Sequence, residues 1–125
     1  MKKYLITSMA LLLVMIANSQ INFKNTQWKG QISSQGEVKM DFKSDTVYIY
    51  KNGNELISTF TYYKSQDTIT IFKAGFGKGP CPMNGKGIYR IEMLENGEKF
   101  NFHLISEECP GRGMGLTSSV FERIH

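Results

Sequence analysis

Histidine, cysteine and charge of a single sign are all scarce in this chain of 125 residues. His103 and His125 are its two histidines, and together with its two cysteines they do not show the ligand spacing of a zinc site. His103 falls on the polar phase of a strand pattern, and no residue near it in the pattern could position it as a general base. We therefore expect no catalytic residue, no metal and no cofactor, and we predict that the protein is not an enzyme.

Long apolar runs are absent except at the N-terminus. Lys2 and Lys3 precede an apolar run over residues 4–17, and Ala17-Asn18-Ser19 places small residues at the two positions that a signal peptidase reads. This order predicts a signal peptide over residues 1–19, cleaved after Ser19, and a secreted or periplasmic protein. The run is marginal for a spanning helix, and an uncleaved anchor is the alternative. No cysteine near the cleavage site could carry a lipid, so we expect no membrane anchor in the mature chain.

Residues 20–125 then form one domain of 106 residues. The net charge of +4 includes Lys2 and Lys3, so the domain carries only +2, with basic and acidic residues interspersed. This charge is too weak to attract a polyanion, and we expect no nucleic-acid partner. The tyrosines near the middle of the chain are expected to face outward and pair across strands. They are Tyr48, Tyr50, Tyr62 and Tyr63.

The two cysteines, Cys81 and Cys109, lie in separate segments rich in glycine and proline. An even pair in a small exported domain predicts a disulfide, and two free thiols are the alternative. The entropy model assigns about 3.5 kcal/mol to closing a loop of this length. Glu107 and Glu108 stand beside the second cysteine and are expected to be solvated.

Alternation of apolar and polar residues dominates the chain after residue 25. In residues 37–43, for example, Val38, Met40 and Phe42 share one phase, and in residues 99–104 Phe100, Phe102 and Leu104 do. Such a period predicts antiparallel strands with one buried face, and no window shows a helical stripe. Asn52-Gly53 and Asn96-Gly97 predict tight hairpins. The predicted strands are residues 27–32, 37–43, 46–51, 55–63, 68–71, 89–93, 99–104 and 116–123.

Eight strands joined mostly by short turns predict an all-β fold, an eight-stranded antiparallel up-and-down β-barrel. Closure removes the free sheet edges, and an open two-sheet sandwich is the alternative. An interior of this width is either filled by its own side chains or holds one small ligand. The side chains expected to point into it are Trp28, Met40, Phe42, Phe60, Tyr89, Met93, Phe100 and Phe102.

The order of several motifs resembles that of small secreted bacterial domains of the lipocalin-like, or calycin, type. Trp28 lies in the first strand, a Gly-x-Tyr strand begins at Gly87, and a Cys-Pro-Gly-Arg loop spans residues 109–112. The resemblance implies an eight-stranded barrel, and in larger lipocalins that barrel holds an apolar small molecule. By the same analogy Trp28 closes one end of the barrel, and Arg112 or Arg123 packs on its ring as a structural cation.

Two functions follow as alternatives. The first expectation is an exported, non-enzymatic barrel that binds an apolar small molecule among the eight interior residues. The alternative is a protein-interaction module, such as a secreted inhibitor, whose barrel core is filled and whose unknown protein partner binds the outer surface. The state of the interior distinguishes them.

Overall fold

The structure is a computed structural model that describes residues 22–33, 35–74, 81–82, 84–109 and 111–125. The predicted signal peptide, residues 1–19, lies outside these ranges. Within them, no helix has the length and apolar character needed to cross a membrane.

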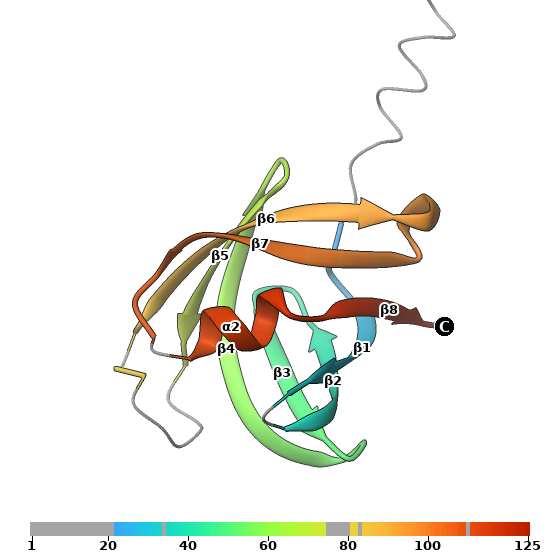
Figure 1. The fold of residues 1–125 in the computed structure, drawn as a ribbon, viewed down its shortest axis with the longest axis horizontal. Coiled ribbons are helices and arrows are strands. Elements are labelled where there is room, and N and C mark those ends of the chain that lie inside the picture. Colours follow the sequence, from blue (N-terminus) through green and yellow to red (C-terminus); the bar gives the residue numbers. More distant parts are fainter. Residues whose placement is uncertain (1–21, 34, 75–80, 83, 110) are drawn as a thin grey trace, which may run out of the picture.

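Eight antiparallel strands close into one barrel, in which each strand pairs with its neighbours in the sequence and β8 returns to β1 (Figure 1). The up-and-down barrel predicted from the alternation is therefore confirmed. The strands are β1 Thr26–Ile32, β2 Gly36–Phe42, β3 Thr46–Lys51, β4 Glu55–Ser65, β5 Thr68–Lys73, β6 Lys86–Leu94, β7 Lys99–Glu107 and β8 Val120–Ile124.

Both predicted turns have the positive φ angles that the Asn-Gly pairs indicated. Asn52 and Gly53 have φ values of 53° and 88° in the short connection between β3 and β4, residues 52–54. Asn96 and Gly97 have φ values of 56° and 86° between β6 and β7, where they belong to a 3-10 turn, η1 Glu95–Gly97.

One helix corrects the expectation of an all-strand chain. Helix α2, Arg112–Thr117, occupies the beginning of the predicted last strand, and β8 begins only at Val120. The helix has six residues, fewer than two turns. A window of about 11 residues is needed before a helical stripe can be recognised, so the pattern could not reveal it. Figure 1 shows α2 running directly into β8.

The last strand closes the barrel with few pairs. β8 pairs with β7 over Lys99–Asn101 and with β1 over Gln27–Lys29. Among the described residues, no strand therefore pairs on that side with the remaining part of β7, from Phe102 to Glu107, or with Gly30–Ile32 of β1. Helix α2 packs against β7 at this place and fills the break in the wall, with Leu116 buried in the core.

A register shift in β7 changes which side chains point inward. Tyr89 of β6 pairs with Leu104, but Ile88 pairs with Ser106, so Ile105 is an extra residue. A bulge of this kind reverses the alternation beyond it. Glu107 thereby points into the barrel, and the expectation that it is solvated was wrong.

Two further side chains differ from the predicted alternation. Leu104 was placed on the buried face, but its side chain borders the break in the wall, where no strand covers it, and it is 54% exposed. Tyr62 was expected to face outward, but it is buried beside Phe42, and its hydroxyl donates a hydrogen bond of 2.6 Å to the Lys43 carbonyl. It lies two residues after Phe60 on β4, on the same face, so the strand's period places both inside.

Candidate functional site

The predicted interior residues do lie together in the barrel. Met93 is partly buried and packs against the core, and the others are buried. Trp28, Phe42, Tyr89 and Phe100 each have 0% exposure, which leaves no space for a water molecule against their side chains. The interior side chains that are slightly more exposed are Met40 and Phe102, at 3%, and Phe60, at 9%.

Phe100 is the centre of the aromatic packing. Its ring centroid lies 4.7 Å from that of Trp28, 5.0 Å from Phe23, 5.1 Å from Phe102 and 5.3 Å from Phe121. Edge-on and stacked pairs at these distances are the favourable arrangements of aromatic rings. Four of the rings expected to line a ligand cavity therefore form a continuous series of ring contacts instead, and they are Trp28, Phe100, Phe102 and Tyr89.

Two of these rings were missed by the sequence analysis. Phe23 precedes β1, so no strand period could place it, yet it is 1% exposed and stacks on Phe42 at 4.9 Å. Thr26 fixes its position, since its hydroxyl donates to the Phe23 carbonyl and accepts from the indole nitrogen of Trp28. Phe121 lies in the strand that was predicted to begin too early, and its alternation was the available signal.

The close packing of Phe121 makes a specific demand on Gly30. A Cβ atom at Gly30 would lie 2.8 Å from Cδ1 of Phe121, and that ring cannot retreat because it stacks on Phe100. We expect Gly30→Ala to lower the free energy of unfolding by about 1–3 kcal/mol through overpacking. Urea denaturation of wild type and variant measures this change in the free energy of unfolding. Lys29→Ala, at the exposed neighbouring position, is the control, and equal stability of the two variants would contradict the argument.

The two arginines take different places. The guanidinium of Arg123 lies over the ring of Trp28, 5.8 Å from its centroid, as the resemblance implied for one of them. Arg112 lies over Phe60 instead, at 5.2 Å. Its side chain enters the barrel from the start of α2 and is only 9% exposed.

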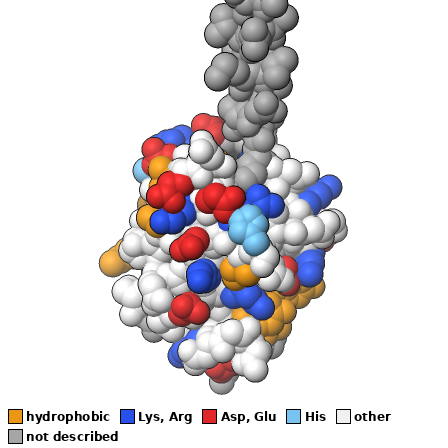
Figure 2. All heavy atoms as spheres, turned by 90° about the vertical axis from the view of Figure 1, so that its right-hand side faces the viewer, with side chains coloured by type: hydrophobic (Ala, Val, Ile, Leu, Met, Phe, Trp, Pro, Cys, Tyr) orange, Lys and Arg blue, Asp and Glu red, His pale blue; other side chains and the backbone are white. Residues whose placement is uncertain are grey.

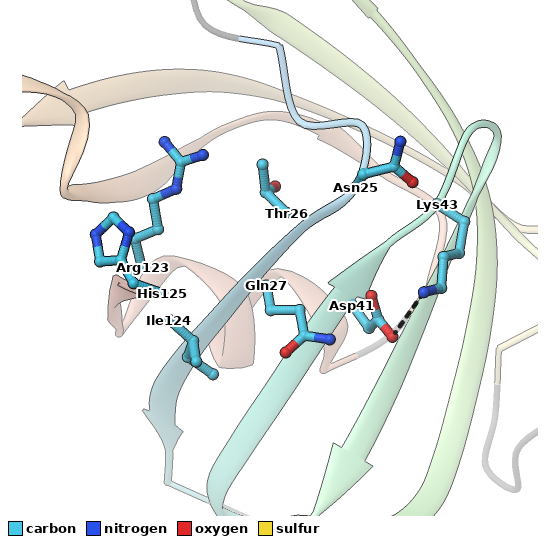
Figure 3. A pocket seen from close by; sticks show the side chains of 8 residues that line it. All are labelled: Asn25, Thr26, Gln27, Asp41, Lys43, Arg123, Ile124 and His125. Carbon is cyan, nitrogen blue, oxygen red and sulfur yellow. Dashed lines mark ion pairs between the residues drawn. The ribbon is translucent and has the colours of Figure 1, made fainter.

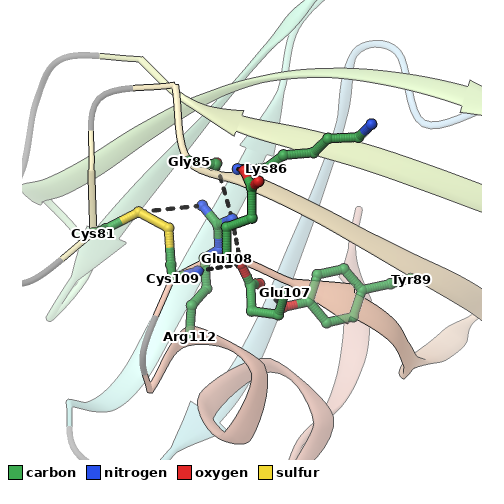
Figure 4. Close-up of polar contacts among 8 residues, drawn as sticks. All are labelled: Cys81, Gly85, Lys86, Tyr89, Glu107, Glu108, Cys109 and Arg112. Carbon is green, nitrogen blue, oxygen red and sulfur yellow. Dashed lines mark hydrogen bonds and ion pairs between the residues drawn. A yellow bond between two sulfur atoms is a disulfide. The ribbon is translucent and has the colours of Figure 1, made fainter.

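A buried ion pair holds Arg112 in place (Figure 4). Its Nε donates to Oε2 of Glu107 at 2.8 Å, and its Nη2 donates to Oε1 at 2.6 Å. The Tyr89 hydroxyl also donates to Oε2, and the backbone N–H of Cys109 donates to Oε1 at 2.9 Å. The carboxylate thus accepts four hydrogen bonds, which occupies its acceptor positions. These contacts hold the carboxylate and the guanidinium in one fixed arrangement.

The ionisation of the cluster follows from these contacts. Burial raises the pKa of Glu107, but the hydrogen bonds from Arg112, Tyr89 and Cys109 outweigh it, and the net pKa lies below the ordinary value. Burial also raises the pKa of Tyr89, and the neighbouring carboxylate adds to the shift. Glu107 is therefore charged and Tyr89 neutral near pH 7.

A carboxyl whose pKa is lowered on folding stabilises the protein fully above its ordinary pKa of 4.5, and this contribution is lost as the pH falls through the lowered value. We therefore expect the free energy of unfolding to fall on acidification below about pH 4.5, and to fall less steeply in Glu107→Gln. Urea titrations at a series of pH values measure the slope. Glu55→Gln, at an exposed position, is the control, and equal slopes for wild type and Glu107→Gln would contradict the assignment.

The disulfide predicted between Cys81 and Cys109 is present beside this cluster, with a Cα–Cα distance of 4.5 Å. The bridge lies against the backbone of Gly85, where a Cβ atom would lie 2.6 Å from the sulfur of Cys109 and 2.9 Å from that of Cys81. Arg112 also donates to the Gly85 carbonyl at 3.0 Å. Glycine is therefore required here, and disulfide, Gly85 and Arg112 form one packed unit.

The histidines lie on the surface. His103 contacts Oε1 of Glu92 at 3.0 Å, and His125 contacts Oε2 of Glu98 at 2.5 Å, in both cases between exposed side chains. In the described ranges, no three side chains of the His, Cys, Asp and Glu types converge as metal ligands would.

The outer surface carries polar hollows. Figure 2 shows acidic and basic side chains interspersed over the face that turns away from the disulfide, with neither sign dominating. One hollow of about 350 Å³ lies between β1, β2 and the end of β8, and in it Asp41 and Lys43 form an ion pair of 3.4 Å (Figure 3). A second hollow, also of about 350 Å³, lies between β1 and the start of β8. Both are open to solvent, and charged side chains of both signs line the second, among them Lys29, Glu37 and Glu122.

The fold and the packed interior define the class of protein: a closed eight-stranded antiparallel β-barrel with a disulfide beside a buried ion pair. This architecture is consistent with a lipocalin-like fold. Comparison of the chain with protein-family models, with curated proteins and with solved structures gave no match.

Proposed function

We propose that residues 20–125 are an exported, non-enzymatic barrel of the lipocalin-like type that acts through its outer surface, as a protein-interaction module. The observation that carries this proposal is the state of the interior. Four of the rings that would line a ligand site contact one another in series, and four of the predicted interior side chains have no exposed surface. An apolar ligand would have to displace them from contacts worth about 0.5–1.5 kcal/mol per ring pair.

Exposed apolar side chains support a role for the surface. Leu104 and Ile105 on β7 are 54% and 58% exposed, and Met114 on the adjacent α2 is 81% exposed. Leu104 borders Gly113, the neighbour of Met114 in the helix. Aliphatic and methionine side chains at such positions favour a protein partner, because they gain free energy when a second surface excludes water from them.

The disulfide supports the exported location. A bridge between Cys81 and Cys109 persists in oxidising compartments and is rare where thiols are kept reduced. The leader expected at residues 1–19 gives the same location. Intact mass of the secreted protein tests this part, since a mass that begins at Gln20 is expected and one that includes residues 1–19 would contradict it.

One titration separates the two functions. Cis-parinaric acid, an apolar fluorescent probe, is added to purified residues 20–125, and we expect no stoichiometric binding. Stoichiometric binding that Phe102→Ala alters would instead support the apolar-ligand function.

A crosslinking experiment tests the proposed interaction surface. A photo-crosslinking residue replaces Ile105, and the variant is incubated with the extracellular fraction of the producing cells and illuminated. A discrete protein adduct is expected, and it should disappear when Met114→Lys is added. The same crosslinking residue at position 55, exposed on β4, is the control. Equal adducts at both positions would contradict a specific interaction surface on β7 and α2.

A further inference from the structure

Helix α2 occupies the break in the barrel wall. A Cβ atom at Gly113 would lie 3.7 Å from the δ carbons of Leu104 on β7, and one at Gly115 would lie 3.3 Å from Cγ2 of Ile32 on β1. The helix thus contacts both edges of the break. Leu116 points from it into the core and is 5% exposed. Because no strand lies between these parts of β7 and β1, α2 is the part of the described wall that covers the interior here.

The sequence of α2 does not by itself favour a helix. It has six residues, of which Gly113 and Gly115 each disfavour a helix by about 1 kcal/mol relative to alanine. Its N-cap is Gly111, which has a φ of 82° and no side chain that could cap the first turn. Isolated helices shorter than about 12 residues are marginal even in favourable sequences. The helical conformation therefore depends on what holds its two ends.

The N-terminal end is held by the disulfide and by Arg112 together. Cys109 lies three residues before Arg112 and is bonded to Cys81. Gly85 in turn accepts a hydrogen bond from Arg112, and its backbone lies against both sulfur atoms. The Gly85 carbonyl also accepts from the backbone N–H of Lys73 on β5 at 3.1 Å, so Gly85 keeps its place at the start of β6. Separation of the sulfurs instead removes the covalent link between this part of β6 and the segment that leads into α2, and leaves the hydrogen bonds of Arg112 as the contacts that hold the N-terminal end of the helix.

We propose that α2 is a redox-controlled plug, seated when Cys81 and Cys109 are bonded and released when they are reduced. The reductant is a dithiol. Its thiolate attacks one cysteine sulfur, the S–S bond breaks and a mixed disulfide forms; its second thiol then displaces that cysteine. Two electrons and two protons pass to the two cysteines, and the reductant leaves as a disulfide. Release of α2 uncovers the inner wall beneath it, including Tyr89 and Phe60, and alters the exposed surface that carries Met114.

Amide hydrogen exchange followed by NMR tests this directly on purified residues 20–125. The reporters are the amides of Gly115 and Ser118, which donate to Gly111 and Met114 at 3.2 Å, and reference amides in β2 and β3. In dithiothreitol we expect exchange of the α2 reporters to accelerate at least tenfold while β2 and β3 keep their protection. Cys81→Ser/Cys109→Ser should reproduce this without reductant.

Ile49→Val, in β3 with the disulfide intact, is the control for a general loss of stability, and it should not accelerate the α2 amides selectively. Unchanged protection of α2 on reduction would overturn the proposal. Equal loss of protection in α2, β2 and β3 would also overturn it, because the disulfide would then hold the whole barrel rather than the helix.

Discussion

Phe100→Ala is expected to lower the free energy of unfolding by about 3–5 kcal/mol, the range observed when a large ring is removed from a packed core. Phe100 has no exposed surface and contacts the rings of Trp28, Phe102 and Phe121. A small domain has a total stability of about 5–10 kcal/mol, so the variant should be close to unfolding. Urea denaturation followed by the fluorescence of Trp28 measures the change.

Tyr63→Ala is the matched control, because it removes a ring of similar size from a strand position that is 57% exposed. We expect it to change stability by less than about 1 kcal/mol. A loss of less than about 1.5 kcal/mol in Phe100→Ala would show that the ring has few neighbours in solution. The interior would then have room for a ligand, contrary to the proposed function.

Arg112→Met is expected to lower the free energy of unfolding by a similar amount, about 3–5 kcal/mol, because it leaves the buried carboxylate of Glu107 without its counter-charge. The two side chains are 9% and 7% exposed, so water cannot replace the lost partner without opening the barrel. Methionine preserves much of the packing against Phe60, which makes the loss mainly electrostatic. The free energy of unfolding at pH 7 is the measurement.

The double variant Arg112→Met/Glu107→Gln supplies the control. Removing both charges avoids a lone buried ion, so the double variant should be more stable than Arg112→Met alone, with a coupling of about 0.5–3 kcal/mol. Additive losses would mean that the two groups do not act as a pair. Lys99→Met removes a surface ion pair with Glu95 for comparison, and it should lower the free energy of unfolding by less than about 1 kcal/mol.

The barrel could be predicted because most strands alternate regularly. Val38, Met40 and Phe42 occupy successive inward positions of β2, and their period of two needs no tertiary information. The disulfide could be predicted from the even number of cysteines and from the oxidising compartment that the predicted signal peptide implies. The interior set was also identified, since an aromatic residue on the inward phase of a closed barrel has nowhere else to point.

The ion pair could not be predicted in the same way. Its geometry depends on Ile105, one extra residue in β7 that moves Glu107 from the outer to the inner face. A bulge leaves no reliable mark in a single sequence, because Leu104-Ile105-Ser106 reads as an ordinary stretch of strand. Helix α2 was missed for a related reason: tertiary contacts at Leu116 and Arg112 override a glycine-rich sequence that is unfavourable for a helix.

The pairing of β8 with β1 bears on how the chain folds. Gln27 lies opposite Ile124, at the other end of the domain, whereas every other strand pair joins neighbours in the sequence. Pairing β8 with β1 has the largest loop-closure entropy cost of any strand pair, because the loop between them is the longest. Only three residues of each strand pair, so few contacts offset this cost. Ring closure therefore belongs late in folding. Until β8 docks, β1 and β7 present free backbone groups on which another chain can pair. Fast closure therefore protects the folding chain against aggregation.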